Sequence, residues 1–194
     1  MGYHRAGFEV VGVDKKPQPH YPFEFHQADA LDFPLDGFDV IHASPPCQAY
    51  STLASFTPAG GWPDLYEATR ERLVGSAARW VIENVVGAPY RSGFILCGSM
   101  FGLKVRRHRN FECSELMFPP ACDHAGQGRP VGVYGHGQFY WENGVRCWRN
   151  VPRAEAEAAM GIDWMSREEL SEAIPPAFTE WVGTQLLNVL EAAA

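Results

Sequence analysis

The chain has 194 residues, the length of one ordinary domain, and 46% of them are apolar, which is enough to bury a core. Only 20% are charged, and no apolar run approaches the roughly 18 residues that cross a bilayer, so disorder and a membrane partner are not expected. The formal charge of −7 argues against a generic nucleic-acid coat, which needs excess Lys and Arg. We expect a globular protein that is cytoplasmic by default, because no signal-peptide core follows the first residues.

The first half of the chain predicts strands and one helix. Residues 9–14 and 38–43 are short, β-branched runs that turn or breaker residues end, and each is expected to be a buried strand. Apolar residues at helical spacing predict a helix over 65–81, which runs into a third strand over 80–86. Strand, helix, strand with polar residues at the strand ends is the pattern of a parallel α/β sheet.

The second half changes in texture between residues 111 and 151, where Pro, Gly, Cys, His and Trp prevail with little periodicity. This stretch is expected to be a small, irregular insert. Helices are predicted over 154–160 and 178–190. The expected organisation is therefore one α/β domain made of residues 1–110 and 152–194, interrupted by the insert.

The five cysteines are odd in number and form no CxxC pair, which argues against a disulfide scaffold. Several residues of zinc-ligating type gather in or near the insert: Cys113, Cys122, His124, His136 and Cys147. Their spacings match no strong zinc pattern, and scattered His and Cys are usually packing or surface residues. We therefore predict no metal site.

One cysteine follows the second predicted strand, in the segment Ser44–Gln48. Ligand chemistry gathers at the carboxyl ends of parallel strands, so Cys47 behind a rigid Pro-Pro turn is a candidate nucleophile, although buried, inert cysteines are common. Glu83 ends the next strand at the same edge, unless it only caps that strand. Arg107 and Arg109 would project to one side if their segment is extended, or would form a solvated basic edge.

The order Pro46-Cys47-Gln48, Glu83-Asn84-Val85, then Arg-x-Arg followed by Phe resembles the DNA cytosine-5 methyltransferases. Further segments resemble the same family: residues 3–14, 27–30, 97–103, 160–163 and 173–176. The resemblance spans nearly the whole chain. It implies a Rossmann-like, class I S-adenosylmethionine-dependent methyltransferase sheet and methyl transfer to cytosine C5 in double-stranded DNA.

The resemblance also implies the roles of the site residues. Cys47 is the thiolate that adds to C6 of a flipped-out cytosine. Glu83 contacts N3 and the exocyclic amine, and Arg109 contacts the carbonyl. Arg107 supports the site or a phosphate.

The cofactor-binding residues that the resemblance implies are Asp14 for the ribose and Asp29 for the adenine, with Ala30 and Pro45 beside them. The residues expected to contact DNA are Gln48, Ser51, Lys104, Arg106, Arg146 and Arg149. A local basic cleft is therefore expected on an otherwise acidic chain.

The chain departs from the family pattern in three places. Val105 stands where the family has a glutamine, and Ser171-Glu172-Ala173 replaces a Gly-Asn. The family's first strand and its Phe-x-Gly-x-Gly loop are absent, which predicts weakened cofactor binding. Either the true protein starts upstream, or the chain is a non-catalytic DNA- or protein-binding relative. A domain that acts on a free nucleotide is a third possibility, because thiolate addition at pyrimidine C6 also serves that chemistry.

Overall fold

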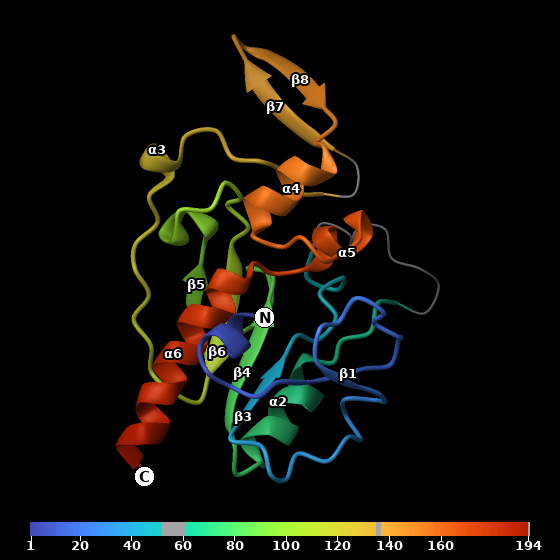
Figure 1. Cartoon of the computed structure of the whole chain (residues 1–194), viewed down its shortest axis with the longest axis vertical. Helices are drawn as coiled ribbons and strands as arrows, with labels where there is room; N and C mark the ends of the chain where they lie inside the picture. The colour runs from blue at the N-terminus through green and yellow to red at the C-terminus, as the bar shows by residue number, and fades with distance from the viewer. Residues whose placement is uncertain (52–60, 135–136, 194) are drawn as a thin grey trace.

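The computed structural model describes residues 1–51, 61–134 and 137–193 of the chain (Figure 1). In chain order, these residues form α1 (Gly2–Arg5), β1 (Val11–Asp14), β2 (Glu24–Gln27), β3 (Val40–Ala43), α2 (Tyr66–Val74), β4 (Arg79–Asn84), β5 (Phe94–Leu96), the 3-10 helix η2 (Gly98–Phe101), β6 (Arg109–Cys113), α3 (His124–Gln127), β7 (Gln138–Glu142), β8 (Val145–Arg149), α4 (Arg153–Met160), α5 (Arg167–Glu172) and α6 (Pro176–Ala193). No helix within these ranges combines the length and apolar character that a membrane crossing requires.

The described strands form three separate sheets. β1 and β2 pair in parallel, with Asp14 opposite Gln27. The largest sheet has the order β3-β4-β6-β5, in which β3 and β4 are parallel and β6 is antiparallel to both of its neighbours. β7 and β8 form a hairpin that projects from one end of the molecule (Figure 1). The expected α/β class is confirmed, and the main sheet is mixed rather than parallel throughout.

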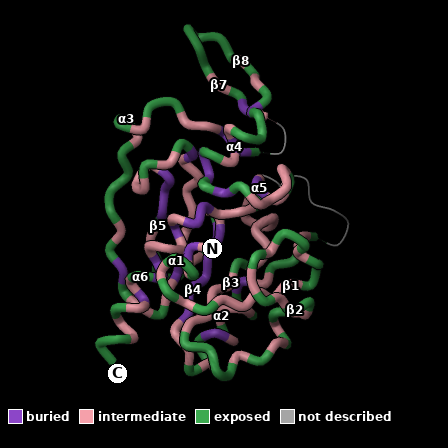
Figure 2. The backbone as a smooth tube through the Cα atoms, viewed as in Figure 1, coloured by how far each residue is buried: buried purple, intermediate pink, exposed green. Residues whose placement is uncertain are grey.

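Successive residues of β4 face opposite sides of the sheet, and each side packs against a different helix. Val81 packs in a cluster with Phe178 of α6, whereas Ile82 packs in a cluster with Tyr66 of α2. Figure 2 shows the buried stretch that runs along β4. Each large apolar side chain that is buried here contributes about 1.5–3 kcal/mol to folding, so this three-layer core fixes the position of the strand ends.

A second core lies under α4 and α5. Val133 and Val151, from the segment expected to be an insert, pack there in one cluster with Leu170 of α5. β6 also crosses the expected boundary at residue 111. The segment 111–151 is therefore anchored in the body of the protein at both of its ends.

The segment expected to be irregular contains a regular hairpin. Asn143 and Gly144, with φ of 50° and 78°, form its tip. Two consecutive residues with positive φ give the turn that matches the twist of paired strands, and Asn-Gly is its strongest sequence signal. The expectation of an irregular insert is wrong for residues 138–149, because the Asn143-Gly144 turn lets the flanking segments pair as antiparallel strands.

The predicted helix bounds agree with the structure for two helices and differ for one. The helices expected over 154–160 and 178–190 are confirmed as α4 and α6. The helix expected over 65–81 ends at Val74, followed by Gly75, and β4 begins at Arg79. β2 and β5, short strands of four and three residues, were not predicted.

Candidate functional site

The parallel strands β3 and β4 end at one edge of the main sheet, as the sequence predicted. Ala43 lies opposite Ile82 in their register, so the next residues, Ser44 and Glu83, follow side by side. Burial raises the pKa of the Glu83 carboxyl, and a hydrogen bond from Ser44 partly opposes this shift. The segment that leads to Cys47 therefore leaves the sheet beside Glu83.

Asn84, the last residue of β4, ties this segment down. Its Nδ2 donates a hydrogen bond to the carbonyl of Pro45 at 2.9 Å, and its Oδ1 accepts one from the Val85 N–H at 2.8 Å. Beyond Pro45 the chain turns, with the Tyr50 N–H donating to the Cys47 carbonyl at 3.0 Å. Cys47 is a half-buried free cysteine.

Glu83 and Arg109 meet at the same edge because β6 runs antiparallel to β4. Glu83 is only 6% exposed, and its Oε1 lies 3.0 Å from Arg109 Nε. Burial raises the pKa of the Glu83 carboxyl, and the Arg109 guanidinium opposes this shift. Oε1 accepts no hydrogen bond from any described residue, so the ion pair leaves a buried acceptor unused. Buried polar atoms are normally paired, so this oxygen at a strand end is a candidate contact for a water molecule or a ligand.

Arg107 does not share this arrangement. Its φ is +39°, so the segment is not extended as the sequence analysis assumed. Its guanidinium donates to the carbonyls of Ser171, Ala173 and Val133. Burial and the nearby Arg109 lower the pKa of Arg107 to about 10. Arg107 therefore stabilises the fold behind Arg109, because its guanidinium donates to backbone carbonyls.

A series of hydrogen-bonded side chains, which the sequence did not predict, leads from α1 to Glu83. Tyr3 Oη lies 2.7 Å from His42 Nδ1, and His42 Nε2 lies 3.1 Å from Ser44 Oγ. Burial lowers the pKa of His42 to about 4, so the imidazole is neutral at physiological pH. The only sequence signal for this series is His42, a polar residue within an apolar strand. Its partner Tyr3 lies 39 residues away in the sequence.

The expected cofactor residues lie mostly on the other parallel pair. Asp14 ends β1 and Asp29 follows β2, so the two carboxylates leave neighbouring strand ends. Asp29 forms an ion pair with Lys15 at 2.7 Å, and hydrogen bonds from Lys15 and the Leu31 N–H lower the pKa of its carboxyl. Ala30 is exposed next to Asp29. Pro45, the fourth residue of this set, lies on the main sheet's edge.

Four of the expected DNA contacts lie near the main sheet. Gln48 Oε1 is buried and accepts no hydrogen bond from the described residues, and Ser51 Oγ donates to the Gln48 carbonyl at 3.4 Å. Lys104 is exposed. Arg106 Nε donates to Gln127 Oε1 at 3.1 Å, which holds α3 against the loop before β6.

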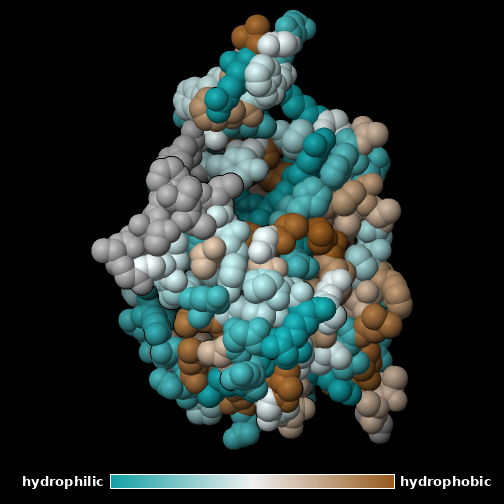
Figure 3. All heavy atoms as spheres, turned by 180° about the vertical axis from the view of Figure 1, so that it is seen from behind, coloured by the Kyte–Doolittle hydropathy of each residue, from teal (hydrophilic) through white to brown (hydrophobic). Residues whose placement is uncertain are grey.

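The other two expected DNA contacts lie on the β7–β8 hairpin. The Arg146 guanidinium lies over the Phe139 ring, 4.1 Å from its centroid. Arg149 forms an ion pair with Glu155 at 2.8 Å, so its charge is already neutralised within the chain. The hairpin carries exposed aromatic surface, such as Trp141 at 72% exposure. Figure 3 shows hydrophilic and hydrophobic side chains side by side on this projection.

A second buried carboxylate, Glu112 on β6, was also missed. It is 0% exposed and accepts hydrogen bonds from Tyr66 Oη at 2.5 Å, Arg70 Nε at 2.8 Å and the Arg91 N–H at 3.4 Å. The sequence gives no signal for it, because its partners come from α2 and from the loop after β4.

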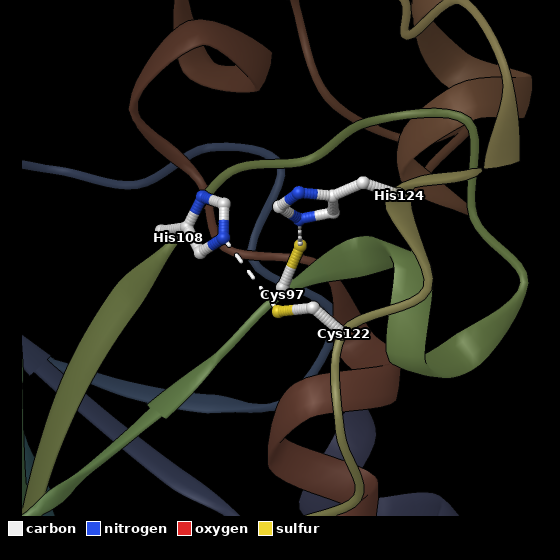
Figure 4. Close-up of side chains that lie close together, drawn as sticks. All are labelled: Cys97, His108, Cys122 and His124. Carbon is white, nitrogen blue, oxygen red and sulfur yellow. Dashed lines mark hydrogen bonds between the residues drawn. The ribbon is translucent and has the colours of Figure 1, made fainter.

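Metal-ligating side chains gather at one point, which we call the Cys/His cluster. It consists of Cys97, His108, Cys122 and His124 (Figure 4). Cys122 and His124 were among the zinc-type residues that the sequence analysis considered, whereas their two partners were not. Cys113 and Cys147 lie elsewhere, in β6 and β8, and His136 lies outside the described residues.

Neither a protein-family model nor a curated protein matches this chain. Its function must therefore be inferred from its own residues and their arrangement.

Proposed function

We propose that this chain is a DNA cytosine-5 methyltransferase. The observation that carries the proposal is the buried Glu83 Oε1, left without a hydrogen bond by the described residues beside Arg109. This pair lies at the sheet edge from which the Cys47 segment leaves, tied by Asn84 to Pro45. A thiol, a buried carboxyl and a guanidinium at one edge fit the three contacts that a cytosine ring needs.

The arrangement of the strands supports a Rossmann-like methyltransferase sheet. The family's first strand lies in the middle of its sheet, and here the parallel pair β1–β2 is separate from the β3-β4-β6-β5 sheet. In a single sheet of that family, the two cofactor-side carboxylates and the Cys47 segment would share one edge.

The proposed reaction begins at Cys47, because cytosine C5 is a poor nucleophile. The thiolate forms a bond to C6, and the ring electrons move towards C5 and N3. When bound, S-adenosylmethionine supplies the electrophilic methyl group that C5 takes. Methyl transfer to C5 leaves S-adenosylhomocysteine. Water then takes the C5 proton, the C6–S bond breaks to restore the thiolate, and the proton on N3 returns to Glu83.

Glu83 and Arg109 hold the ring while the charge develops. Burial raises the pKa of the Glu83 carboxyl, which favours the protonated form that would donate to N3. Its unpaired Oε1 accepts from the exocyclic amine. Arg109 donates to the ring carbonyl, and Arg107, held by three carbonyls, acts as a positioning residue behind it.

The residues on the cofactor side are hydrogen-bond acceptors, and an adenosine group offers the matching donors. Asp14 and Asp29 present carboxylates at neighbouring ends of β1 and β2. Asp14 would accept hydrogen bonds from the ribose hydroxyls, and Asp29 from the adenine amine. Ala30 and Pro45 complete this set.

The DNA duplex would lie across the main sheet's edge, with the target base flipped out. Gln48 and Ser51 follow the nucleophile, and Lys104 and Arg106 precede Arg109. Arg146, on the projecting hairpin, and Arg149 at its base complete the set of proposed DNA contacts, although Arg149 would have to exchange its Glu155 partner for a phosphate. Because the chain's net charge is −7, binding without a cognate site should be weak and salt-sensitive.

Covalent trapping tests the proposal. DNA replicated with 5-fluorodeoxycytidine presents every sequence context, and fluorine at C5 prevents the final elimination. With S-adenosylmethionine, the chain should form an adduct that survives denaturing electrophoresis. Cys47→Ala should abolish the adduct, and the matched control Cys113→Ala should keep it.

Three outcomes would contradict the proposal. A folded chain that binds duplex DNA without any adduct would be a non-catalytic relative. An adduct with free 5-fluorodeoxycytidine monophosphate but none with duplex DNA would indicate a nucleotide enzyme. An adduct that persists in Cys47→Ala would remove Cys47 as nucleophile. Exchange of tritium from cytosine C5 without cofactor tests thiolate addition separately from cofactor binding.

A further inference from the structure

The Cys/His cluster has the dimensions of a metal site. Cys97 Sγ lies 3.4 Å from His124 Nε2, and Cys122 Sγ lies 3.7 Å from His108 Nε2 (Figure 4). All four ligand atoms lie within 4.8 Å of one another. Tetrahedral zinc, with Zn–S of about 2.3 Å and Zn–N of about 2.0 Å, places sulfur and nitrogen about 3.5 Å apart. Both measured sulfur–nitrogen distances match this edge.

We propose that the Cys/His cluster binds one Zn²⁺ as a closed, structural site. Two thiolates and two neutral imidazoles are the soft and borderline ligands that zinc prefers in a tetrahedron. The two negative sulfurs cancel the charge of the ion, which matters because Cys97 is 0% exposed. Four protein ligands leave no position open for water, so the ion would serve the fold rather than the reaction.

The backbone brings the first ligand to this place through a tight approach. Gly98 follows Cys97, and its N–H donates to the Arg106 carbonyl at 2.7 Å. A Cβ on Gly98 would lie 1.9 Å from the Val105 carbonyl oxygen, so only glycine allows the two segments to pass so closely. This contact sets Cys97 beside the segment that carries His108.

The second pair of ligands is held by a small hydrogen-bonded turn. Asp123, between Cys122 and His124, donates its N–H to Ser99 Oγ at 3.2 Å and accepts the Gly126 N–H at 2.7 Å. Ser99 Oγ also lies 3.3 Å from Cys97 Sγ. Such outer contacts orient metal ligands and raise affinity.

The ion would fasten a segment that has little regular structure. Residues 114–123, which connect β6 to α3, contain no helix or strand. Through the ion, their end would be joined to the end of β5 and to the start of β6. His108 directly precedes Arg109, so the site also fixes the backbone beside the proposed cytosine contact. The zinc proposal does not rest on the methyltransferase proposal, because its test measures metal and not activity.

Metal analysis of the untagged chain, purified from zinc-supplemented cells, tests the site. We expect one zinc per chain after extensive dialysis. Replacing the zinc with cobalt(II) should give a thiolate-to-metal charge-transfer band and the absorption of tetrahedral cobalt. Cys122→Ser and His124→Asn should lower the bound zinc at least about tenfold, whereas the matched controls Cys147→Ser and His26→Asn should retain it.

Several results would overturn the proposal. One is a folded wild-type chain that holds no stoichiometric zinc and gives no cobalt charge-transfer band. Another is zinc content that Cys122→Ser and His124→Asn leave unchanged. If the variants fail to fold, the cobalt spectrum of the wild-type chain still decides, because it needs no substitution.

Discussion

Two buried glutamates occupy neighbouring positions on adjacent strands and have opposite surroundings. Glu112 on β6 lies opposite Ile82, and Glu83, the next residue of β4, lies opposite Phe111. Three donors saturate Glu112, including the Arg70 guanidinium. Glu83 has the Arg109 guanidinium and a hydrogen bond from Ser44, and its Oε1 is a buried oxygen that accepts nothing from the described residues. The comparison separates a carboxylate whose oxygens are saturated by donors from one that retains an unused buried acceptor.

The substitution Glu83→Gln tests whether Glu83 serves the reaction and not the stability of the fold. We expect adduct formation with 5-fluorocytosine DNA to slow by about 10²–10⁴-fold, because the amide cannot protonate N3. The free energy of unfolding should fall by less than in Glu112→Ala, since the introduced amide keeps the side-chain volume and an oxygen beside the Arg109 guanidinium. Single-turnover adduct formation and urea unfolding measure the two quantities. A variant that unfolds but reacts normally when folded would reverse the assignment.

The second is Glu112→Ala, which should do the opposite. It leaves the Arg70 guanidinium without its buried partner, and we expect the free energy of unfolding to fall by about 3–5 kcal/mol. Urea unfolding measures the change, and a double-mutant cycle with Arg70→Ala isolates the ion pair. The rate of adduct formation per folded molecule should stay unchanged. A large loss of that rate would mean that Glu112 also shapes the site.

The third prediction concerns pH, because the hydrogen-bonded series from Tyr3 to Glu83 contains a titratable histidine, His42. The pKa of His42 falls to about 4 in the fold and is near 6.5 in the unfolded chain. Below pH 6.5 the unfolded state binds the additional proton, so stability should decrease as the pH falls from 6.5 to about 4. Urea unfolding across this range should show a steeper loss for the wild-type chain than for His42→Gln. Equal slopes would contradict the neutral, buried imidazole.

The smallest effect comes from an ion pair near Glu112 that is exposed. Glu67 pairs with the Arg91 side chain at 2.7 Å, with both side chains more than half exposed. Glu67→Ala should change the free energy of unfolding by about 0–1 kcal/mol, measured by the same urea method. A larger loss would show that the side-chain pair, and not only the Arg91 N–H, supports Glu112.

The sequence predicted the elements whose signals are local. Helices α4 and α6 and the strands around Asp14, His42 and Glu83 follow from apolar spacing and from breakers. The shared edge of β3 and β4 followed from the rule for parallel strands. The Glu83–Arg109 ion pair agrees with the expected grouping at this edge, although its unpaired oxygen could not be foreseen.

What could not be predicted depends on pairing between distant segments. The antiparallel β6 places Glu112 against α2, and no pattern within β6 announces partners more than 20 residues away. Arg107 was expected to lie extended, but its φ and its three carbonyl acceptors come from tertiary packing. The Cys/His cluster could not be predicted because Cys97 and His108 lie outside the stretch 111–151 and reach Cys122 and His124 only through tertiary packing.

The separation of the sheets has a consequence for amide exchange. Within the described residues, β1 pairs only with β2, whereas β4 is flanked by a strand on each side. A two-stranded ladder with exposed edges opens at a lower free energy than the centre of a covered sheet. The amides of β1 and β2 should therefore exchange as one fast group, and those of β4 should exchange only when the whole domain unfolds. Any ligand that bridges the two sheets would slow the first group and leave the second unchanged.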